Sequence, residues 1–388
     1  MKGKYFIADQ EDIDSKLASD VYFSRTSQFI SENDGKKVIA EITASSDEMI
    51  NFTGLEEMIR LLEGKKISLR AIPEGTVIQT RDSAGIPIPF VTIEGIYESI
   101  MEYETSLLGF ICQSSGISTQ AMKFYMQIYP KEFVSFGIRR MHPAISPMID
   151  RAAFIGGASG VSGILGGELT STVPVGTMPH SIAIIMGEKK AWEYVYRNSP
   201  PGRRTLLIDT FGDEKTKALE IAEMFPETDY IRLDTHSSRR GNFPSIVREV
   251  RWELDLRGYR NIKIMVSGGL KLDQIAELKT AGAELFGVGT SIASAKPVDF
   301  AMDIVKVGDI PISKKGKYSG SKDVLKCPEC GNVRVLPIGV ELECHGPMKS
   351  LLNEMIHDGK RTSKPETAIE IRSRSVGNAL KNIQQNNN

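Results

Sequence analysis

Two segments that run from apolar, branched residues directly into glycine constrain the fold more than any other part of the sequence. Residues 262–269 read IKIMVSGG and residues 285–291 read LFGVGTS, with a helical pattern over residues 272–281 between them. The two runs are typical of buried strands, so they predict a strand–helix–strand unit whose strand ends carry almost no side chains. Such ends let backbone N–H groups approach an anion, as in barrel enzymes that hold a phosphate after their late strands. We expect the chain to bind a phosphorylated ligand.

Either glycine pair alone is equally typical of an ordinary tight turn, so the argument depends on how many such units occur. Residues 205–210 and 230–235 repeat the strand pattern, and each segment contains a carboxylate near its end, Asp209 or Asp234. An amphipathic stretch over residues 214–225 separates them. Four strand–helix units in a row predict an α/β fold with a parallel sheet or barrel, whose chemistry gathers at the carboxyl ends of the strands.

Changes in composition divide the 388 residues into three predicted domains. Residues 1–114 mix a helical pattern over residues 47–63 with short β-type runs, which predicts an α+β N-terminal domain. Residues 115–297 contain the strand–helix units and, over residues 181–197, a further helical pattern, so they form the predicted catalytic barrel domain. Residues 298–388 contain a lysine-rich run and three of the four cysteines, which predicts a small C-terminal domain.

The charge balance and the N-terminal sequence favour a cytoplasmic protein without a nucleic-acid or membrane partner. The formal net charge is −1, so no overall positive charge is available to hold nucleic acid or an anionic membrane. The N-terminus lacks the apolar core of a signal peptide, and the uncharged stretch over residues 152–167 is short and rich in glycine. Cys112 stands alone in an apolar context, which is typical of a buried core thiol.

Two segments carry side chains suited to binding a small aromatic acid or a phosphate. Phe136, Arg139 and Arg140 lie within five positions, where an arginine beside an aromatic ring can clamp a planar carboxylate. The alternative is a surface turn with solvated arginines. His180 follows Gly176 and Thr177 and precedes a helical pattern, so it either packs near a helix start, faces a phosphate or accepts a phosphoryl group.

Asp209 and Asp234 are candidates for catalysis because carboxylates at that face of a barrel usually bind or react. They would stabilise the oxocarbenium-like state of a displacement at sugar C1, or hold Mg²⁺ bound to a pyrophosphate leaving group. The alternative for each is a salt bridge with Arg232 or Arg239.

The C-terminal cysteines are spaced as ligands of a metal ion. Cys327 and Cys330 form a CxxC pair, and Cys344 with His345 follows at a plausible return distance. Because Cys344 and His345 are adjacent, Glu343 or His357 remains an alternative fourth ligand. The absence of a second CxxC pair and the position late in the chain favour a structural Zn²⁺ over a catalytic one.

Taken together, these motifs resemble those of the archaeal type of nicotinate phosphoribosyltransferase over nearly the whole chain. The segments that carry the resemblance are residues 18–23, 136–140, 176–180, 207–210, 231–234, 266–269 and 286–290. Two segments depart from the family. Residues 160–163 read GVSG where many relatives have GTSN, and residues 343–346 read ECHG where archaeal relatives have CxCG.

The resemblance implies a type II phosphoribosyltransferase: an irregular α/β barrel that works as a homo-oligomer, a dimer with shared active sites or a multiple of it. A neighbouring subunit would donate Asp20 and Tyr22, with Tyr22 and Phe136 on opposite faces of a pyridine ring. Arg139 and Arg232 would contact the ring or its carboxylate, while glycines and Thr290 hold the 5-phosphate. The implied substrate-binding set is Asp20, Tyr22, Phe136, Arg139, Arg140, Arg232, Ser267, Gly268, Gly269, Gly287, Gly289 and Thr290. The implied catalytic set is His180, Asp209 and Asp234.

We therefore expect transfer of a phosphoribosyl group from 5-phosphoribosyl-1-pyrophosphate to nicotinate, with Mg²⁺ as cofactor. His180 matches the histidine that relatives phosphorylate, so ATP is the expected co-substrate. The nearest rival is a quinolinate phosphoribosyltransferase, which would need a denser set of cations than Arg139, Arg140 and Arg232 to bind two carboxylates. A rival from another class is a nucleic-acid-binding protein built on the lysine run and the cysteine cluster.

Overall fold

The computed structural model describes residues 5–31 and 35–386, and the chain separates into two compact units. One unit, here the terminal unit, combines Met1–Thr119 with Lys296–Asn378. The other, here the central unit, combines Gln120–Ala295 with Ala379–Asn388. The long helix α4 (Glu104–Ile128) begins in the first and ends in the second, as does α14 (Ala368–Asn386). The three-domain division stays a prediction, although residues 296–378 share a unit with the N-terminal segment.

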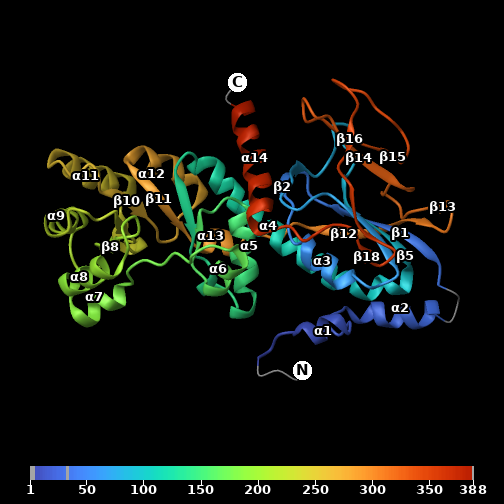
Figure 1. Ribbon diagram of the computed structural model, residues 1–388, viewed down its shortest axis with the longest axis horizontal. Helices are drawn as coiled ribbons and strands as arrows, with labels where there is room; N and C mark the ends of the chain where they lie inside the picture. Colours follow the sequence, from blue (N-terminus) through green and yellow to red (C-terminus); the bar gives the residue numbers. More distant parts are fainter. Residues whose placement is uncertain (1–4, 32–34, 387–388) are drawn as a thin grey trace. The chain divides into compact units, whose positions relative to one another are not determined.

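The terminal unit is built on an antiparallel sheet whose strands come from both ends of the sequence. Its strand order is β13-β12-β1-β5-β3-β17-β18, so β1 lies between β12 and β5, and β3 lies between β5 and β17. Figure 1 labels β1 and β5 from the N-terminal part of the chain together with β12, β13 and β18 from the C-terminal part. The rings of Phe52, Phe90 and Phe300 pack at centroid distances of 5.2–6.0 Å in its core. Two smaller sheets, β2-β4 and β15-β14-β16, complete the unit.

The strands of the terminal unit are β1 (Lys37–Ala44), β2 (Met49–Asn51), β3 (Ile67–Ala71), β4 (Val77–Gln79), β5 (Pro89–Ile96), β12 (Phe300–Val307), β13 (Ile310–Pro311), β14 (Lys322–Lys326), β15 (Val333–Pro337), β16 (Lys349–Ser350), β17 (Asn353–His357) and β18 (Lys360–Arg361). Its helices, besides parts of α4 and α14, are α1 (Gln10–Asp14), α2 (Val21–Ser31), α3 (Leu55–Leu62) and the 3-10 turns η1 (Tyr97–Ser99) and η2 (Met101–Tyr103).

The central unit holds a six-stranded parallel sheet that curls into a half-barrel, in the order β7-β6-β11-β10-β9-β8. Each strand is short and mostly buried, as the apolar runs of the sequence predict. The α/β class with a barrel-like parallel sheet is therefore confirmed. Trp192 on α8 is fully buried and donates its indole N–H to the carbonyl of Leu207 on β8 at 2.8 Å, which fixes that helix on the sheet edge.

The strands of this sheet are β6 (Glu132–Ser135), β7 (Gly160–Val161), β8 (Thr205–Leu207), β9 (Tyr230–Leu233), β10 (Lys263–Val266) and β11 (Ala283–Val288). Its helices are η3 (Ile138–Arg140), η4 (Pro143–Ile145), α5 (Ser146–Ile155), α6 (Ile164–Thr170), α7 (His180–Met186), α8 (Glu188–Asn198), α9 (Glu214–Met224), α10 (Ser237–Arg240), α11 (Phe243–Leu256), η5 (Leu272–Gln274), α12 (Ile275–Ala281) and α13 (Thr290–Ala293).

Candidate active site

The predicted site residues of the central unit follow directly after its strands. Phe136 follows β6, Asp234 follows β9, Ser267 follows β10 and Gly289 follows β11, while Asp209 lies two residues after β8. Because the strands run parallel, all five residues lie at the carboxyl edge of one sheet. The five residues therefore lie at the edge of the sheet where the sequence analysis expects the chemistry.

Arg232 organises the middle of this edge through three side-chain bonds. Its Nε donates to Ser267 Oγ at 2.9 Å and its Nη1 to Thr177 Oγ1 at 2.7 Å. Its Nη2 lies 2.9 Å from Asp234 Oδ2 in a largely buried salt bridge. Ser267 Oγ in turn donates to Asp234 Oδ1 at 2.7 Å, and the guanidinium lies 5.8 Å from the ring centroid of Phe136. The salt bridge between Asp234 and Arg232 considered from the sequence is therefore present, and its geometry fixes both groups.

His180 faces both carboxylates. As the first residue of α7 it places Nδ1 3.2 Å from Thr210 Oγ1, and its Nε2 lies 3.9 Å from Asp209 Oδ2 and 3.7 Å from Asp234 Oδ2. Its side chain keeps 39% of its surface exposed, so the imidazole remains accessible from solvent. A histidine in this position can hold, donate or accept a proton between two acids.

Asp209 is a buried carboxylate without a hydrogen-bond donor at normal distance on either oxygen among the described residues. Its side chain is only 2% exposed. Burial raises the pKa of this carboxyl, while His180 and nearby backbone N–H groups oppose the shift. A buried carboxylate with both oxygens free is costly, which makes Asp209 a natural ligand for a substrate hydroxyl or a hard cation.

The glycines after β10 and within β11 are required by geometry. Gly268 and Gly269 have φ of 87° and 70°, which disfavours any side chain. A Cβ on Gly287 would lie 2.8 Å from the ring of Phe136 and 2.9 Å from Ser267 Cβ. Between residues 35 and 386, no acceptor is recorded for the N–H groups of Gly268 and Gly269. The turn after β10 therefore presents unengaged donors at the site edge. Thr290 begins the short helix α13 one residue after Gly289.

Four predicted residues lie outside these contacts. Arg139 and Arg140 are exposed on η3, and neither guanidinium makes a hydrogen bond or an ion pair with any described residue. Asp20 and Tyr22 belong to the terminal unit, where the backbone N–H of Asp20 donates to Thr105 Oγ1 and Tyr22 is 55% exposed on α2. Their donation to a neighbouring subunit stays a prediction.

Sequence reasoning overlooked two buried charged residues of the central unit, Arg240 and Asp150. Arg240 is 9% exposed and Asp150 is fully buried. Arg240 stands in the polar run SSRR before Gly241, which is typical of a solvent-exposed turn, so no local signal marked it. Asp150 starts a charged pair with Arg151 inside a helical pattern, and only tertiary packing shows that its carboxyl points inward.

The C-terminal cysteines and histidine form a cluster of four ligand atoms within 4.8 Å of one another: Cys327, Cys330, Cys344 and His345. Cys330 Sγ lies 3.6 Å from Cys344 Sγ, and His345 Nδ1 lies 3.3 Å from Cys344 Sγ and 4.0 Å from Cys327 Sγ. Adjacency of Cys344 and His345 therefore does not prevent both from facing one point. Three thiols and one imidazole fit a tetrahedral Zn²⁺.

The sequence matches one family over most of its length. Residues 20–115 match the quinolinate phosphoribosyl transferase N-terminal domain, and residues 117–303 match the C-terminal domain of the same family. The chain belongs to the quinolinate phosphoribosyl transferase family. The resemblance to type II phosphoribosyltransferases seen in the sequence is thereby confirmed.

Solved and curated relatives of this family member carry related names. A nicotinate-nucleotide pyrophosphorylase from Pyrococcus furiosus is 44% identical, with 98% of each chain covered and a TM-score of 0.93. Human nicotinic acid phosphoribosyltransferase shares the fold, with 93% of each chain covered, 16% identity and a TM-score of 0.70. The nicotinate phosphoribosyltransferase pncB1 of Mycobacterium tuberculosis is 25% identical over 254 residues, which are 61% of this chain and 55% of that protein. The match thus spans about half the length of that curated relative.

Three lysines of the lysine-rich run, residues 313–326, pair with acids of the same unit. Lys314 and Lys317 lie 2.5 and 2.8 Å from the two carboxylate oxygens of Asp303. Lys322 Nζ lies 2.8 Å from Glu41 Oε2 in a buried pair. These contacts leave fewer free cations than the sequence suggests for a nucleic-acid surface. Within residues 5–31 and 35–386, none of the helices combines the length and apolarity needed to span a bilayer.

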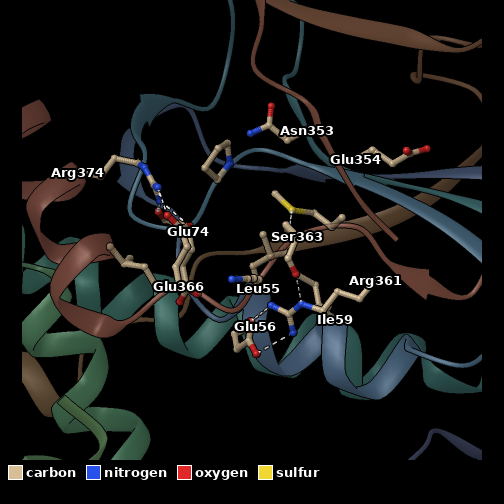
Figure 2. A pocket seen from close by; sticks show the side chains of 14 residues that line it. Leu55, Glu56, Ile59, Glu74, Asn353, Glu354, Arg361, Ser363, Glu366 and Arg374 are labelled. Carbon is tan, nitrogen blue, oxygen red and sulfur yellow. Dashed lines mark hydrogen bonds and ion pairs between the residues drawn. The ribbon is translucent and has the colours of Figure 1, made fainter. Parts of the chain in front are cut away.

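A separate pocket of about 290 Å³ lies within the terminal unit (Figure 2). Its walls carry several charges, and both arginines among them are paired with acids. Arg361 donates to both carboxylate oxygens of Glu56 at 3.0 and 2.7 Å, and Arg374 makes a similar paired contact with Glu366 (Figure 2). None of the predicted site residues lines it. The predicted site residues of the central unit lie instead at the carboxyl edge of its sheet.

Proposed function

We propose that the chain transfers a phosphoribosyl group from 5-phosphoribosyl-1-pyrophosphate to nicotinate, giving nicotinate mononucleotide and pyrophosphate. The observation that carries this proposal is the juxtaposition of Asp209, Asp234 and His180 at a sheet edge that also presents a glycine turn with free N–H groups. Acids suit the positive charge that develops at sugar C1, and the turn suits a phosphate. The names of the relatives support the same chemistry: a nicotinate-nucleotide pyrophosphorylase would run this transfer in reverse.

In the proposed reaction the bond from C1 to the pyrophosphate oxygen breaks and a bond from C1 to the pyridine nitrogen forms. Pyrophosphate leaves with the electron pair, so C1 passes through a state with oxocarbenium character. Asp209 and Asp234 stabilise that charge electrostatically from fixed positions. Asp234 is held by Arg232 and Ser267, whereas the oxygens of Asp209 are free to meet a ribose hydroxyl or a cation.

The donor set of this edge fits the expected Mg²⁺, because carboxylate oxygens are its preferred protein ligands. Asp209 is the best placed of them, since neither of its oxygens has a donor at normal hydrogen-bond distance among the described residues. A bound Mg²⁺ would neutralise charge on the leaving pyrophosphate. We further propose coupling to ATP through phosphorylation of His180, and a structural Zn²⁺ in the Cys327, Cys330, Cys344 and His345 cluster. Thiols held for a metal suit a reducing compartment, the cytoplasm.

The pyridine ring would lie against Phe136, with its carboxylate directed to the exposed guanidinium groups of Arg139 and Arg140. The N–H groups of Arg232 already contact Ser267, Thr177 and Asp234. Arg232 would therefore hold these side chains in position more than it would neutralise the carboxylate of nicotinate. Tyr22 and Asp20 would complete the ring site from a neighbouring copy in a homo-oligomer.

The family description favours one rival substrate, quinolinate. Quinolinate carries two carboxylates and requires a decarboxylation, so it calls for more uncompensated cations. At this edge Arg232 is compensated by Asp234, which leaves Arg139 and Arg140 as the free charges of the predicted set. This balance suits a single carboxylate.

Product identification distinguishes the candidates. The purified protein is given 5-phosphoribosyl-1-pyrophosphate and Mg²⁺ with nicotinate, nicotinamide or quinolinate, and nucleotide and CO₂ are measured. We expect nicotinate to have the highest kcat/KM, by roughly tenfold or more over nicotinamide, because a charged hydrogen bond is worth ~1.5–3 kcal/mol. Equal use of nicotinamide would contradict the role of the arginines, and release of CO₂ from quinolinate would establish the rival.

A further inference from the structure

Arg240 is buried against the turn that follows β10, and its guanidinium bonds almost entirely to backbone carbonyls. Its Nε donates to the carbonyl of Thr235 at 2.9 Å. Its Nη2 donates to the carbonyl of Ser267 at 3.3 Å and also to that of Gly268. The guanidinium carbon lies 4.4 Å from the ring centroid of Phe243, which covers its other side. One side chain therefore joins the loop after β9 to the turn after β10.

These bonds determine which way the peptide groups of the turn face. In a trans peptide the C=O and the following N–H point in opposite directions. Because the carbonyls of Ser267 and Gly268 point at Arg240, the N–H groups of Gly268 and Gly269 must point away from it. Neither N–H has a recorded acceptor in the described structure, so both remain free donors.

The space around Gly268 shows how closely this turn is held. A Cβ there would lie 2.5 Å from Arg240 Nη2 and 2.9 Å from Asp234 Oδ1, and its φ of 87° already excludes most side chains. The far end of the turn is also fixed, because Ser291 Oγ donates to the carbonyl of Leu270 at 2.5 Å. Arg240 thus supplies the bonds on one side of a turn that is anchored on the other.

We propose that Arg240 is a positioning residue that shapes the Ser267–Gly269 turn for the 5-phosphate of the phosphoribosyl substrate. The identity of the anion rests on the proposed function, whereas the shaping of the turn rests on the three carbonyl bonds. Burial lowers the pKa of Arg240, and Asp234 and Asp209 offset this only in part. Arginine nevertheless remains protonated at physiological pH, so a positive charge stays beside the turn.

The test compares binding of ribose 5-phosphate and of nicotinate, each measured by calorimetry on the full chain. Arg240→Met keeps the aliphatic packing against Phe243 but removes every carbonyl bond. Arg240→Lys keeps the charge with fewer bonds in a different geometry. Arg239→Met is the matched control, because Arg239 is the exposed neighbour on α10 with no recorded side-chain contact among the described residues. Thermal unfolding checks that each variant is folded.

We expect Arg240→Met to weaken ribose 5-phosphate binding about tenfold or more, and Arg240→Lys to weaken it roughly threefold. Nicotinate affinity should stay within about twofold of wild type in both variants, as should both affinities in Arg239→Met. If Arg240→Met fails to unfold cooperatively, the selective loss in Arg240→Lys decides the question. Unchanged ribose 5-phosphate binding, or an equal loss for both ligands, would overturn the proposal.

Measuring product formation beside ligand binding separates this inference from the proposed function. A wild-type protein that binds ribose 5-phosphate through Arg240 but forms no nicotinate mononucleotide would refute the transfer reaction and support the positioning role. If the wild-type protein forms nicotinate mononucleotide and Arg240→Met keeps the wild-type KM for 5-phosphoribosyl-1-pyrophosphate, the transfer reaction is supported and the positioning role is refuted.

Discussion

At the scale of single residues, the central unit buries a carboxyl group that the proposed mechanism does not use. Asp150 on α5 is fully buried, and its Oδ2 accepts a hydrogen bond from the backbone N–H of Gly163 at 2.9 Å. Its other oxygen has no partner in the described structure. Desolvation raises the pKa of this carboxyl to about 6, and the Gly163 N–H only partly offsets the effect.

The raised pKa of Asp150 predicts a pH-dependent cost to stability. Since the folded-state pKa lies above the unfolded value, folding favours the protonated acid, and the free energy of unfolding should decrease as pH rises through about 6. Asp150→Asn removes this titration. Relative to wild type it should therefore gain stability between pH 4 and pH 8, by up to about 3 kcal/mol. Urea unfolding across this range measures the difference, with Asp273→Asn on exposed η5 as control. A difference that does not vary with pH would refute the interpretation.

His180 allows a second test at this scale. If ATP phosphorylates its imidazole, His180→Ala should lose the stimulation by ATP and retain slow uncoupled transfer, because Asp209 and Asp234 remain in place. Initial rates with and without ATP measure this, and label from γ-labelled ATP should appear on wild-type protein in acid-labile form. His357→Ala, an exposed histidine on β17 that pairs with Glu354, is the control. Full ATP stimulation in His180→Ala would return this histidine to a packing role.

At the scale of elements, most strands and helices of the central unit follow the sequence pattern closely. Two predicted helices, however, are not continuous in the structure. The pattern over residues 181–197 divides into α7 and α8 at Gly187, whose φ is 84°. The helix predicted over residues 47–63 is wrong in its first part. There β2 pairs with β4, and α3 begins only after Gly54. A local pattern contains no information about a pairing partner distant in sequence, so only the strand–helix repeats could be predicted with their boundaries.

Gly287 tests how tightly β11 fits against its neighbours. In Gly287→Ala the new methyl would meet both the Phe136 ring and Ser267 Cβ, so we expect a loss of about 1–3 kcal/mol of stability. Displacement of the ring should also raise KM for nicotinate more than it lowers kcat. Gly109→Ala on α4, where a Cβ meets open space, is the control for the same change. Normal stability together with normal KM would show that the strand can yield at this point.

At the scale of the whole molecule, the carboxyl edge of the sheet was predictable because its residues stand in motifs next to strands. Arg240 and Asp150 were not, since burial of a charge depends on packing between elements that are distant in sequence. The metal cluster was predictable only in part. Its ligands could be named from spacing, but only the structure shows that Cys344 and His345 both face Cys327 and Cys330.

The cluster predicts that zinc stabilises the terminal unit without taking part in transfer. Sheet β15-β14-β16 flanks the cluster, and the N–H of Val335 donates to the buried carboxylate of Asp82 at 2.9 Å. Cys327→Ser should lower zinc content and, for a loss of about 2 kcal/mol, reduce Tm by roughly 4–8 °C. Elemental analysis and calorimetry measure both, with Cys112→Ser as control. Wild-type protein without stoichiometric zinc, or a folded Cys327→Ser variant without turnover, would contradict this assignment.

The order of strands in the terminal unit also bears on how the protein is made. On the ribosome, β1 and β3 emerge early, but β12 and β17, which flank them in the finished sheet, are synthesised only after the entire segment Gln120–Ala295. That segment contains all six strands of its own sheet. We therefore expect the parallel sheet to form first on the nascent chain, while β1 and β3, which can already pair with β5, each keep one outer edge unpaired. Protection of those edges until synthesis ends is a demand that this topology places on the cell.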